Sequence, residues 1–171
     1  MANLLHGGKG RPLHPMLVHF PVALYTTSLL FDGLSHAAGN GNDYVRGAFT
    51  LLVAGLVMSV LAALTGFADF LLIDAGSRSW RLALTHMSVM LVTTGLFLAD
   101  AILRSRDLDV TQTQVGPLVL SLFGVAGVAL GALLGGDLVF RHGRRVEAGP
   151  IVLDDHEEPA QGGLDERRAG T

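Results

Sequence analysis

The chain has 171 residues, of which 50% are hydrophobic and only 16% are charged, and its formal net charge at neutral pH is −3. Soluble domains carry about 25% charged residues, so the composition argues against a soluble bundle with polar outer faces. Cysteine is absent, which excludes disulfides, iron–sulfur clusters held by thiolates, covalent c-type haem attachment and thiol nucleophiles in this chain.

Four apolar stretches follow a short N-terminal segment, residues 1–12. Each is long enough to cross a bilayer, because roughly 20 apolar residues at 1.5 Å rise span the hydrocarbon core. We predict membrane-spanning helices at about 15–37, 46–74, 80–104 and 115–140. The fold class expected for residues 13–146 is therefore all-α, an integral membrane four-helix up-and-down bundle. The acidic segment 147–171 is rich in proline and glycine and is predicted to be disordered.

The first stretch is expected to stay in the protein as a membrane span. His19, Pro21 and Asp32 interrupt it, whereas the apolar region of a cleaved signal peptide is continuous. Basic residues near the ends of the spans predict the orientation. One face of the membrane receives seven of them, Lys9, Arg11, Arg78, Arg81, Arg141, Arg144 and Arg145, and the other receives Arg46, Arg104 and Arg106. This bias predicts a multi-pass inner (plasma) membrane protein with both termini in the cytoplasm.

Ionisable residues inside the spans gather at two depths. Near the cytoplasmic face each helix contributes one, and His14 lies at the start of the first helix; the set is His14, His19, Asp69, His86 and Asp137. Near the other face lie Asp32, His36 and Asp100, about 20 Å away along the helices. Ionisable groups among lipid tails are costly, so their presence indicates functional use.

Helical spacing predicts which faces point into the bundle. His86, Thr93 and Asp100 share one face of the third helix, and His19 and Thr26 share one face of the first; we expect both faces to point inward. Pro21 removes one backbone hydrogen bond and predicts a local bend beside His19. The glycines at four-residue spacing in the last helix, Gly127, Gly131 and Gly135, allow another helix to approach closely. That helix belongs either to the same chain or to a second copy in a homo-oligomer.

Four segments together resemble a known family. They are residues 13–21 (LHPMLVHFP), 65–69 (TGFAD), His86 and 135–143 (GGDLVFRHG). The chain over about 11–146 is similar to bacterial membrane proteins grouped as domain of unknown function 2231. The resemblance implies a four-helix membrane bundle, joined in some relatives to Rieske or cytochrome c domains, and hence redox work near the membrane. This chain has no such fused domain, so a redox role would require a separate redox partner protein.

The first hypothesis for the cytoplasmic-side residues is b-type haem with His19 and His86 as axial ligands, because imidazoles from facing helices can approach a macrocycle from opposite sides. Arg11, Arg78 and Arg81 would then lie where the propionates need cations. Thr65 and Gly66 would leave room for the ring.

Three other hypotheses stay open. A non-haem iron, manganese or zinc site would use His19, Asp69, His86, Asp137 and His14, a mixed nitrogen and oxygen set. A proton or solute path would run between His86 and Asp100 on one helix and past Asp32 and His36 on another, with Thr26 and Thr93 between the two depths. Finally, the protein would be a structural or partner-binding membrane protein, in which pairs such as His86 with Asp69 and His19 with Asp137 only fix helix packing.

A redox-associated or haem b-binding membrane subunit is the interpretation that we favour, with the lipid bilayer as its environment. The sequence contains no phosphate-binding glycine loop and no nucleophile elbow, so enzymatic hydrolysis or group transfer has no support. It also lacks the basic, aromatic surface that nucleic-acid binding requires.

Overall fold

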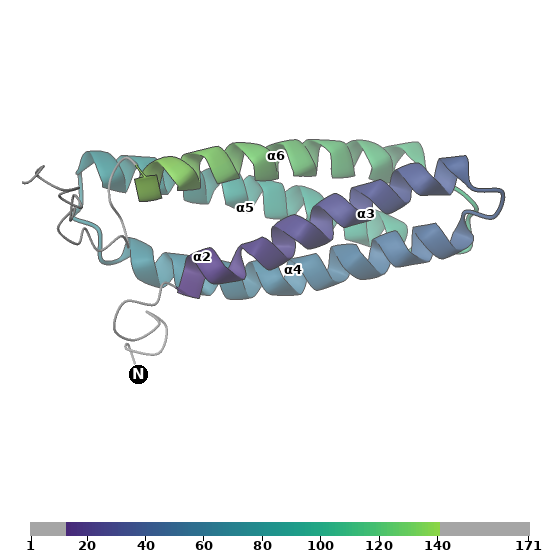
Figure 1. Ribbon diagram of the computed structural model, residues 1–171, viewed down its shortest axis with the longest axis horizontal. Coiled ribbons are helices and arrows are strands. Elements are labelled where there is room, and N and C mark those ends of the chain that lie inside the picture. The colour runs from purple at the N-terminus through teal and green to yellow at the C-terminus, as the bar shows by residue number, and fades with distance from the viewer. Residues whose placement is uncertain (1–12, 141–171) are drawn as a thin grey trace, which may run out of the picture.

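Every regular element between residues 13 and 140, the part of the chain that the computed structural model describes, is a helix. The helices are α2 (Leu13–Leu17), α3 (His19–Ala37), α4 (Asn42–Phe70), α5 (Arg78–Arg104) and α6 (Val115–Phe140). Since α2 and α3 together form one span, four spans alternate in direction along the chain (Figure 1). This confirms the predicted all-α up-and-down bundle. The predicted N-terminal segment and acidic tail lie outside the described residues.

The first span is interrupted at Val18, close to the predicted bend. Pro21 has no N–H with which to bond the carbonyl of Leu17, while the Val18 amide still donates to the His14 carbonyl at 3.1 Å. The Val22 amide donates to the Val18 carbonyl at 3.3 Å. The proline thus separates a short helical turn, α2, from the long helix α3.

Local capping explains where the third span starts. The backbone of Gly76 has a φ of 78°, a left-handed conformation that favours glycine. Ser77 follows in extended conformation, and its hydroxyl accepts a hydrogen bond from the Trp80 amide at 3.0 Å. This N-cap starts α5 at Arg78, two residues earlier than predicted. Helix α4 begins and ends about four residues earlier than predicted, whereas α6 covers the predicted residues.

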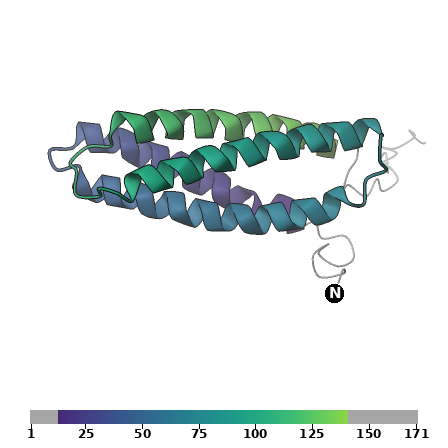
Figure 2. The same ribbon diagram turned by 180° about the vertical axis from the view of Figure 1, so that it is seen from behind.

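The bundle has two distinct ends, visible from the front and from behind (Figures 1 and 2). The first end, here called the terminal end, contains the start of α2, the end of α6 and the connection from α4 to α5. The opposite end, here called the hairpin end, contains the α3–α4 and α5–α6 connections. Leu13 and Phe140 therefore lie on the same side of the bundle, as an even number of spans requires.

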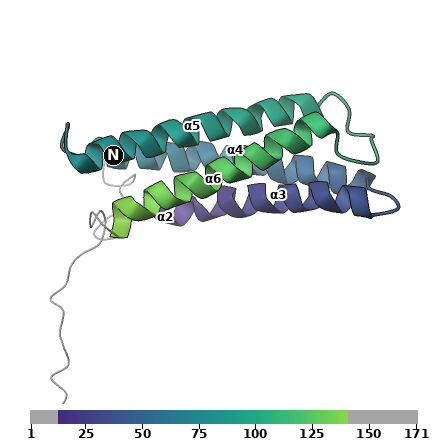
Figure 3. The same cartoon turned by 90° about the horizontal axis from the view of Figure 1, so that it is seen from above.

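The four spans pair as two hairpins. The first, formed by α2, α3 and α4, packs against the second, formed by α5 and α6 (Figure 3). At the centre of their contact the rings of Tyr25 and Phe97 stack with centroids 3.7 Å apart and planes 8° from parallel. Glycines back both rings, because a Cβ at Gly55 would lie 2.6 Å from Tyr25 and one at Gly124 would lie 2.5 Å from Phe97. Only glycine fits behind this stack.

The outward surface of the spans is apolar. Between 17% and 28% of each span's apolar window is buried within the bundle, and large side chains such as Leu91 (76% exposed) and Leu133 (71% exposed) face outward. A water-soluble bundle would cover this surface with polar groups, whereas lipid tails solvate it. The chain therefore has four helices that are long and apolar enough to cross a membrane.

The glycine series of α6 packs against α5 of the same chain. A Cβ at Gly127 would contact Thr93, one at Gly131 would contact Met90, and one at Gly135 would lie 3.3 Å from the His86 ring. The small-residue surface is therefore filled within the chain. Of the two alternatives for the helix that approaches Gly127, Gly131 and Gly135, the structure shows the one within the same chain.

Candidate functional site

The inward face of the first span differs from the predicted one. Buried residues along α3 recur at three- and four-residue spacing, and they are Pro21, Tyr25, Ser28, Asp32 and Ser35. His19 and Thr26 are exposed on the outer side, so the prediction that they point inward was wrong. Thr26 tolerates this position because its hydroxyl donates to the carbonyls of Val22 and Ala23 on its own helix, at 2.8 and 3.1 Å.

On α5 the predicted inward face is confirmed. Thr93 and Asp100 are buried, and His86 is half-buried near the terminal end of the same face. The third span therefore carries polar side chains from one end of the bundle to the other.

A pair of imidazoles lies at the terminal end, between the two hairpins. The rings of His14 on α2 and His86 on α5 have centroids 6.5 Å apart, with planes at 79°. His14 thus occupies the inward position that the sequence analysis gave to His19. The space that a side chain at Gly66 would need is filled by the His14 ring, 2.7 Å from the ideal Cβ position, so the glycine makes room for this imidazole.

Both rings are held by the same kind of hydrogen bond. Nδ1 of His14 lies 2.8 Å from the carbonyl oxygen of Ala62, and Nδ1 of His86 lies 3.0 Å from that of Gly131. A carbonyl oxygen only accepts, so in the neutral ring Nδ1–H is the donor and the lone pair is on Nε2. Metal-ligating histidines use this arrangement to fix ring orientation and tautomer.

The other predicted site residues that the structure describes lie at the same end of the bundle. Asp69 and Asp137 are half-buried near the ends of α4 and α6, at the same end of the bundle. Arg78 and Arg81 are in the first turn of α5, and Nη1 of Arg81 donates to the Gly76 carbonyl at 2.7 Å. Arg11 lies outside the described residues. Within residues 13–140 no three histidine, aspartate or glutamate side chains come together as a metal-binding group, so the predicted mixed His and Asp set is not assembled.

A second polar site at the hairpin end is more completely buried. The Arg104 guanidinium donates from Nη1 to Asp32 Oδ1 at 2.5 Å, from Nη2 to Asp32 Oδ2 at 2.8 Å and from Nε to Asp100 Oδ1 at 2.8 Å. The side chains of Asp32 and Asp100 are 0% exposed and that of Arg104 is 2% exposed. These ion pairs connect α3 of the first hairpin to α5 of the second.

Hydroxyl groups complete this site, which we call the Arg104 cluster and define as Asp32, Asp100, Arg104, Thr113 and Ser121. Ser121 Oγ donates to Asp100 Oδ2 at 2.9 Å and accepts from Arg104 Nη2 at 3.0 Å. Thr113 Oγ1 donates to Asp32 Oδ1 at 2.8 Å. Within the described residues every buried side-chain polar atom has a hydrogen-bond partner, so the cluster meets the condition under which buried charge is tolerated.

The loop that carries Thr113 is fixed to the other hairpin. The Thr113 amide donates to Ser35 Oγ at 3.0 Å, and the side-chain amide of Asn42 donates to the carbonyls of Leu108 and Val110 at 2.9 and 3.2 Å. The connection between α5 and α6 is thereby held over the cluster by bonds to both α3 and α4.

Sequence reasoning identified both aspartates of the cluster but missed its cation. Arg104 is the last residue of α5, and its place at the end of an apolar stretch resembled that of a topology determinant. The spacing of Asp100 and Arg104 could have identified the cation, because residues four apart lie on the same face of a helix and can form an ion pair. No comparable spacing in the sequence indicated that Thr113 and Ser121 belong to the cluster.

Comparison with known proteins adds the family. A family model described as "Predicted membrane protein (DUF2231)" matches residues 10–148, which include all four spans and both polar sites. No curated protein and no solved structure matches the chain. The match covers most of the sequence, and the chain belongs to the DUF2231 family of predicted membrane proteins.

Proposed function

We propose that this protein is a redox-associated membrane subunit that binds b-type haem between His14 and His86. The observation that carries the proposal is the pair of imidazoles with centroids 6.5 Å apart, each with Nδ1 directed at a backbone carbonyl. That hydrogen bond leaves Nε2 of each neutral ring as a lone-pair donor.

The number of ligands favours haem over a bare metal ion. Non-haem iron or zinc needs three or four protein ligands, and residues 13–140 bring no three such side chains together. Iron in a porphyrin takes four nitrogens from the macrocycle and needs only two axial groups from the protein. The two histidines are sufficient for that role.

The distance between the ring centroids is close to that expected for two imidazole ligands of one metal. With metal–nitrogen bonds of about 2 Å, two such imidazoles have centroids about 6 Å apart, close to the 6.5 Å found between His14 and His86. Arg78 and Arg81 lie in the first turn of α5, at the same end as His86, and supply cations for propionates. Bound haem would supply one-electron transfer, so a partner protein is required as donor or acceptor.

The orientation that we propose is an inner-membrane protein with both termini, and hence the histidine pair, toward the cytoplasm. Arg104 is buried in its cluster and is not a loop charge, so it leaves the count of basic residues on the opposite face. The count is then seven basic residues for the proposed cytoplasmic face against two, Arg46 and Arg106, for the other. Of these two, Arg46 is paired with Asp109. The positive-inside rule then favours this orientation more strongly than the sequence count did.

The test is the ultraviolet–visible spectrum of the full chain, purified in detergent after expression with haem precursor and recorded oxidised and dithionite-reduced. We expect a Soret band with sharp α and β bands in the reduced state. His14→Ala and His86→Ala should each abolish these bands, because each variant removes one axial nitrogen. Metal analysis of the same sample should give stoichiometric iron.

His19→Ala is the matched control, since His19 is five residues from His14 but faces outward. Its spectrum should equal that of the wild type. A colourless preparation, or colour that persists in both the His14 and His86 variants, would refute haem ligation by this pair. Stoichiometric metal without colour would instead indicate a bare metal ion at the imidazoles.

A further inference from the structure

The Arg104 cluster contains two carboxyl groups and one guanidinium, so with both carboxyl groups ionised its formal charge is −1. Asp32 and Asp100 are fully buried, at a depth where unbalanced charge is costly. We propose that the cluster is a proton-binding site, in which Asp32 takes up one proton from the aqueous phase at the hairpin end. The proposal is independent of haem binding at the terminal end.

The charged groups around the cluster do not supply the missing positive charge. Arg46 of α4 is exposed and paired with Asp109, His36 at the end of α3 is exposed, and Asp107 of the connecting loop adds a further carboxyl group. Helix α6 contributes Ser121 but no charged residue at this end. Among residues 13–140, Arg104 is thus the buried cation that both carboxylates share.

The hydroxyl groups indicate which carboxyl group takes the proton. A protonated carboxyl oxygen needs an acceptor, and Thr113 Oγ1 lies 2.8 Å from Asp32 Oδ1. When Thr113 accepts from Asp32, its own hydroxyl can donate to Ser35 Oγ at 3.4 Å, and Ser35 in turn donates to the Asp32 carbonyl oxygen at 2.7 Å. Reversal of one hydroxyl therefore leaves every group in this chain bonded.

Asp100 lacks such a chain. Its hydroxyl neighbour, Ser121, already accepts a hydrogen bond from Arg104 Nη2 at 3.0 Å. A proton on Asp100 would turn the Ser121 hydroxyl away from the carboxylate to which it donates at present. The proton is therefore better accommodated on Asp32.

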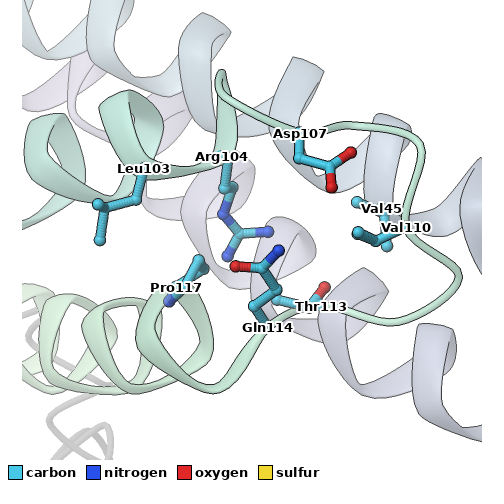
Figure 4. A pocket seen from close by; sticks show the side chains of 8 residues that line it. All are labelled: Val45, Leu103, Arg104, Asp107, Val110, Thr113, Gln114 and Pro117. Carbon is cyan, nitrogen blue, oxygen red and sulfur yellow. The ribbon is translucent and has the colours of Figure 1, made fainter.

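A small pocket connects this hydroxyl chain to the hairpin end (Figure 4). It has room for about one water molecule, and its lining includes Arg104, Asp107, Thr113 and Gln114. Thr113 thus lies between the pocket and Asp32. In the uptake step, hydronium in the pocket would give a proton to the Thr113 oxygen, and the Thr113 hydroxyl proton would pass to Asp32 Oδ1. Water would remain in the pocket, and no electrons would be gained or lost.

The experiment is infrared spectroscopy of the full chain in detergent, in light and heavy water, across the pH range in which it stays folded. A protonated carboxyl group gives a C=O stretching band that shifts on deuteration. We expect such a band in the wild type and its loss in Asp32→Asn. It should remain in Asp43→Asn, the matched control, because Asp43 is exposed at the same end.

Two further variants keep the proposal testable if Asp32→Asn does not fold. Thr113→Val removes the acceptor of the proton and should shift the band to higher frequency. Asp100→Asn balances Arg104 against one carboxylate, so Asp32 should lose its proton and the band should disappear. Absence of the band in the wild type, its persistence in Asp32→Asn, or its indifference to Thr113→Val would each overturn the proposal.

Discussion

Replacement of Arg104 by methionine is expected to destabilise the folded bundle by about 3–5 kcal/mol, because it leaves two buried carboxyl groups without their shared cation. Asp32, Asp100 and Ser121 would all lose donors at once. The measurement is the unfolding of detergent-purified protein, followed by circular dichroism as a denaturing detergent is added. Folded yield from membranes should fall in parallel.

The matched control is Arg46→Met, which removes an arginine from an ion pair at the same end of the bundle. Arg46 and Asp109 have side chains 53% and 81% exposed, and exposed pairs contribute at most about 1 kcal/mol. A charge-neutral combination, Arg104→Met with Asp32→Asn and Asp100→Asn, should recover most of the stability. If Arg104→Met is no more destabilising than Arg46→Met, the cluster is not essential for the fold.

Gly124→Leu is expected to cost about 1–3 kcal/mol through overpacking of the central layer. A Cβ at Gly124 would lie 2.5 Å from the Phe97 ring, and Phe97 cannot retreat because it stacks on Tyr25. Tyr25 is itself backed by Gly55. The same detergent unfolding curve measures the effect, and the two hairpins should separate at a lower denaturant fraction.

Gly95→Leu is the control for this prediction, since Gly95 lies on the same helix as Phe97 and an added Cβ there meets no atom within 4 Å. The leucine would face lipid, so stability should stay near that of the wild type. Equal destabilisation by both substitutions would mean that glycine matters here for the helix itself and not for the stack.

The sequence predicted the spans well because length and apolarity are properties of each segment alone. It could not fix the rotation of the first span, since His14 and His19 are both near the start of that span and only packing against α4 brings His14 to the Ala62 carbonyl. Counting along each helix predicted how far the terminal-end residues lie from the end of their span. It did not predict which of their side chains meet. The burial of Arg104 was not predictable either, because a residue at the end of a helix is buried only if the following loop covers it.

The proton-binding and haem-binding proposals involve the same two hairpins at opposite ends. His14 and Asp32 belong to the first hairpin, and His86, Asp100 and Arg104 belong to the second. Each site therefore forms only when the hairpins associate, and neither could be recognised from one hairpin alone.

Division of the cluster between the hairpins has a consequence for biogenesis. When the ribosome has delivered α2, α3 and α4 to the insertion machinery, Asp32 is already at membrane depth, but its counter-ion Arg104 lies 72 residues further along the chain. Until α5 arrives, the Asp32 carboxyl group lacks this counter-ion, and a lone charge at membrane depth is costly unless it is neutralised or hydrated. A chain truncated before α5 would therefore expose an unpaired carboxyl group on its first hairpin, and we expect it to accumulate in the membrane less than the full chain.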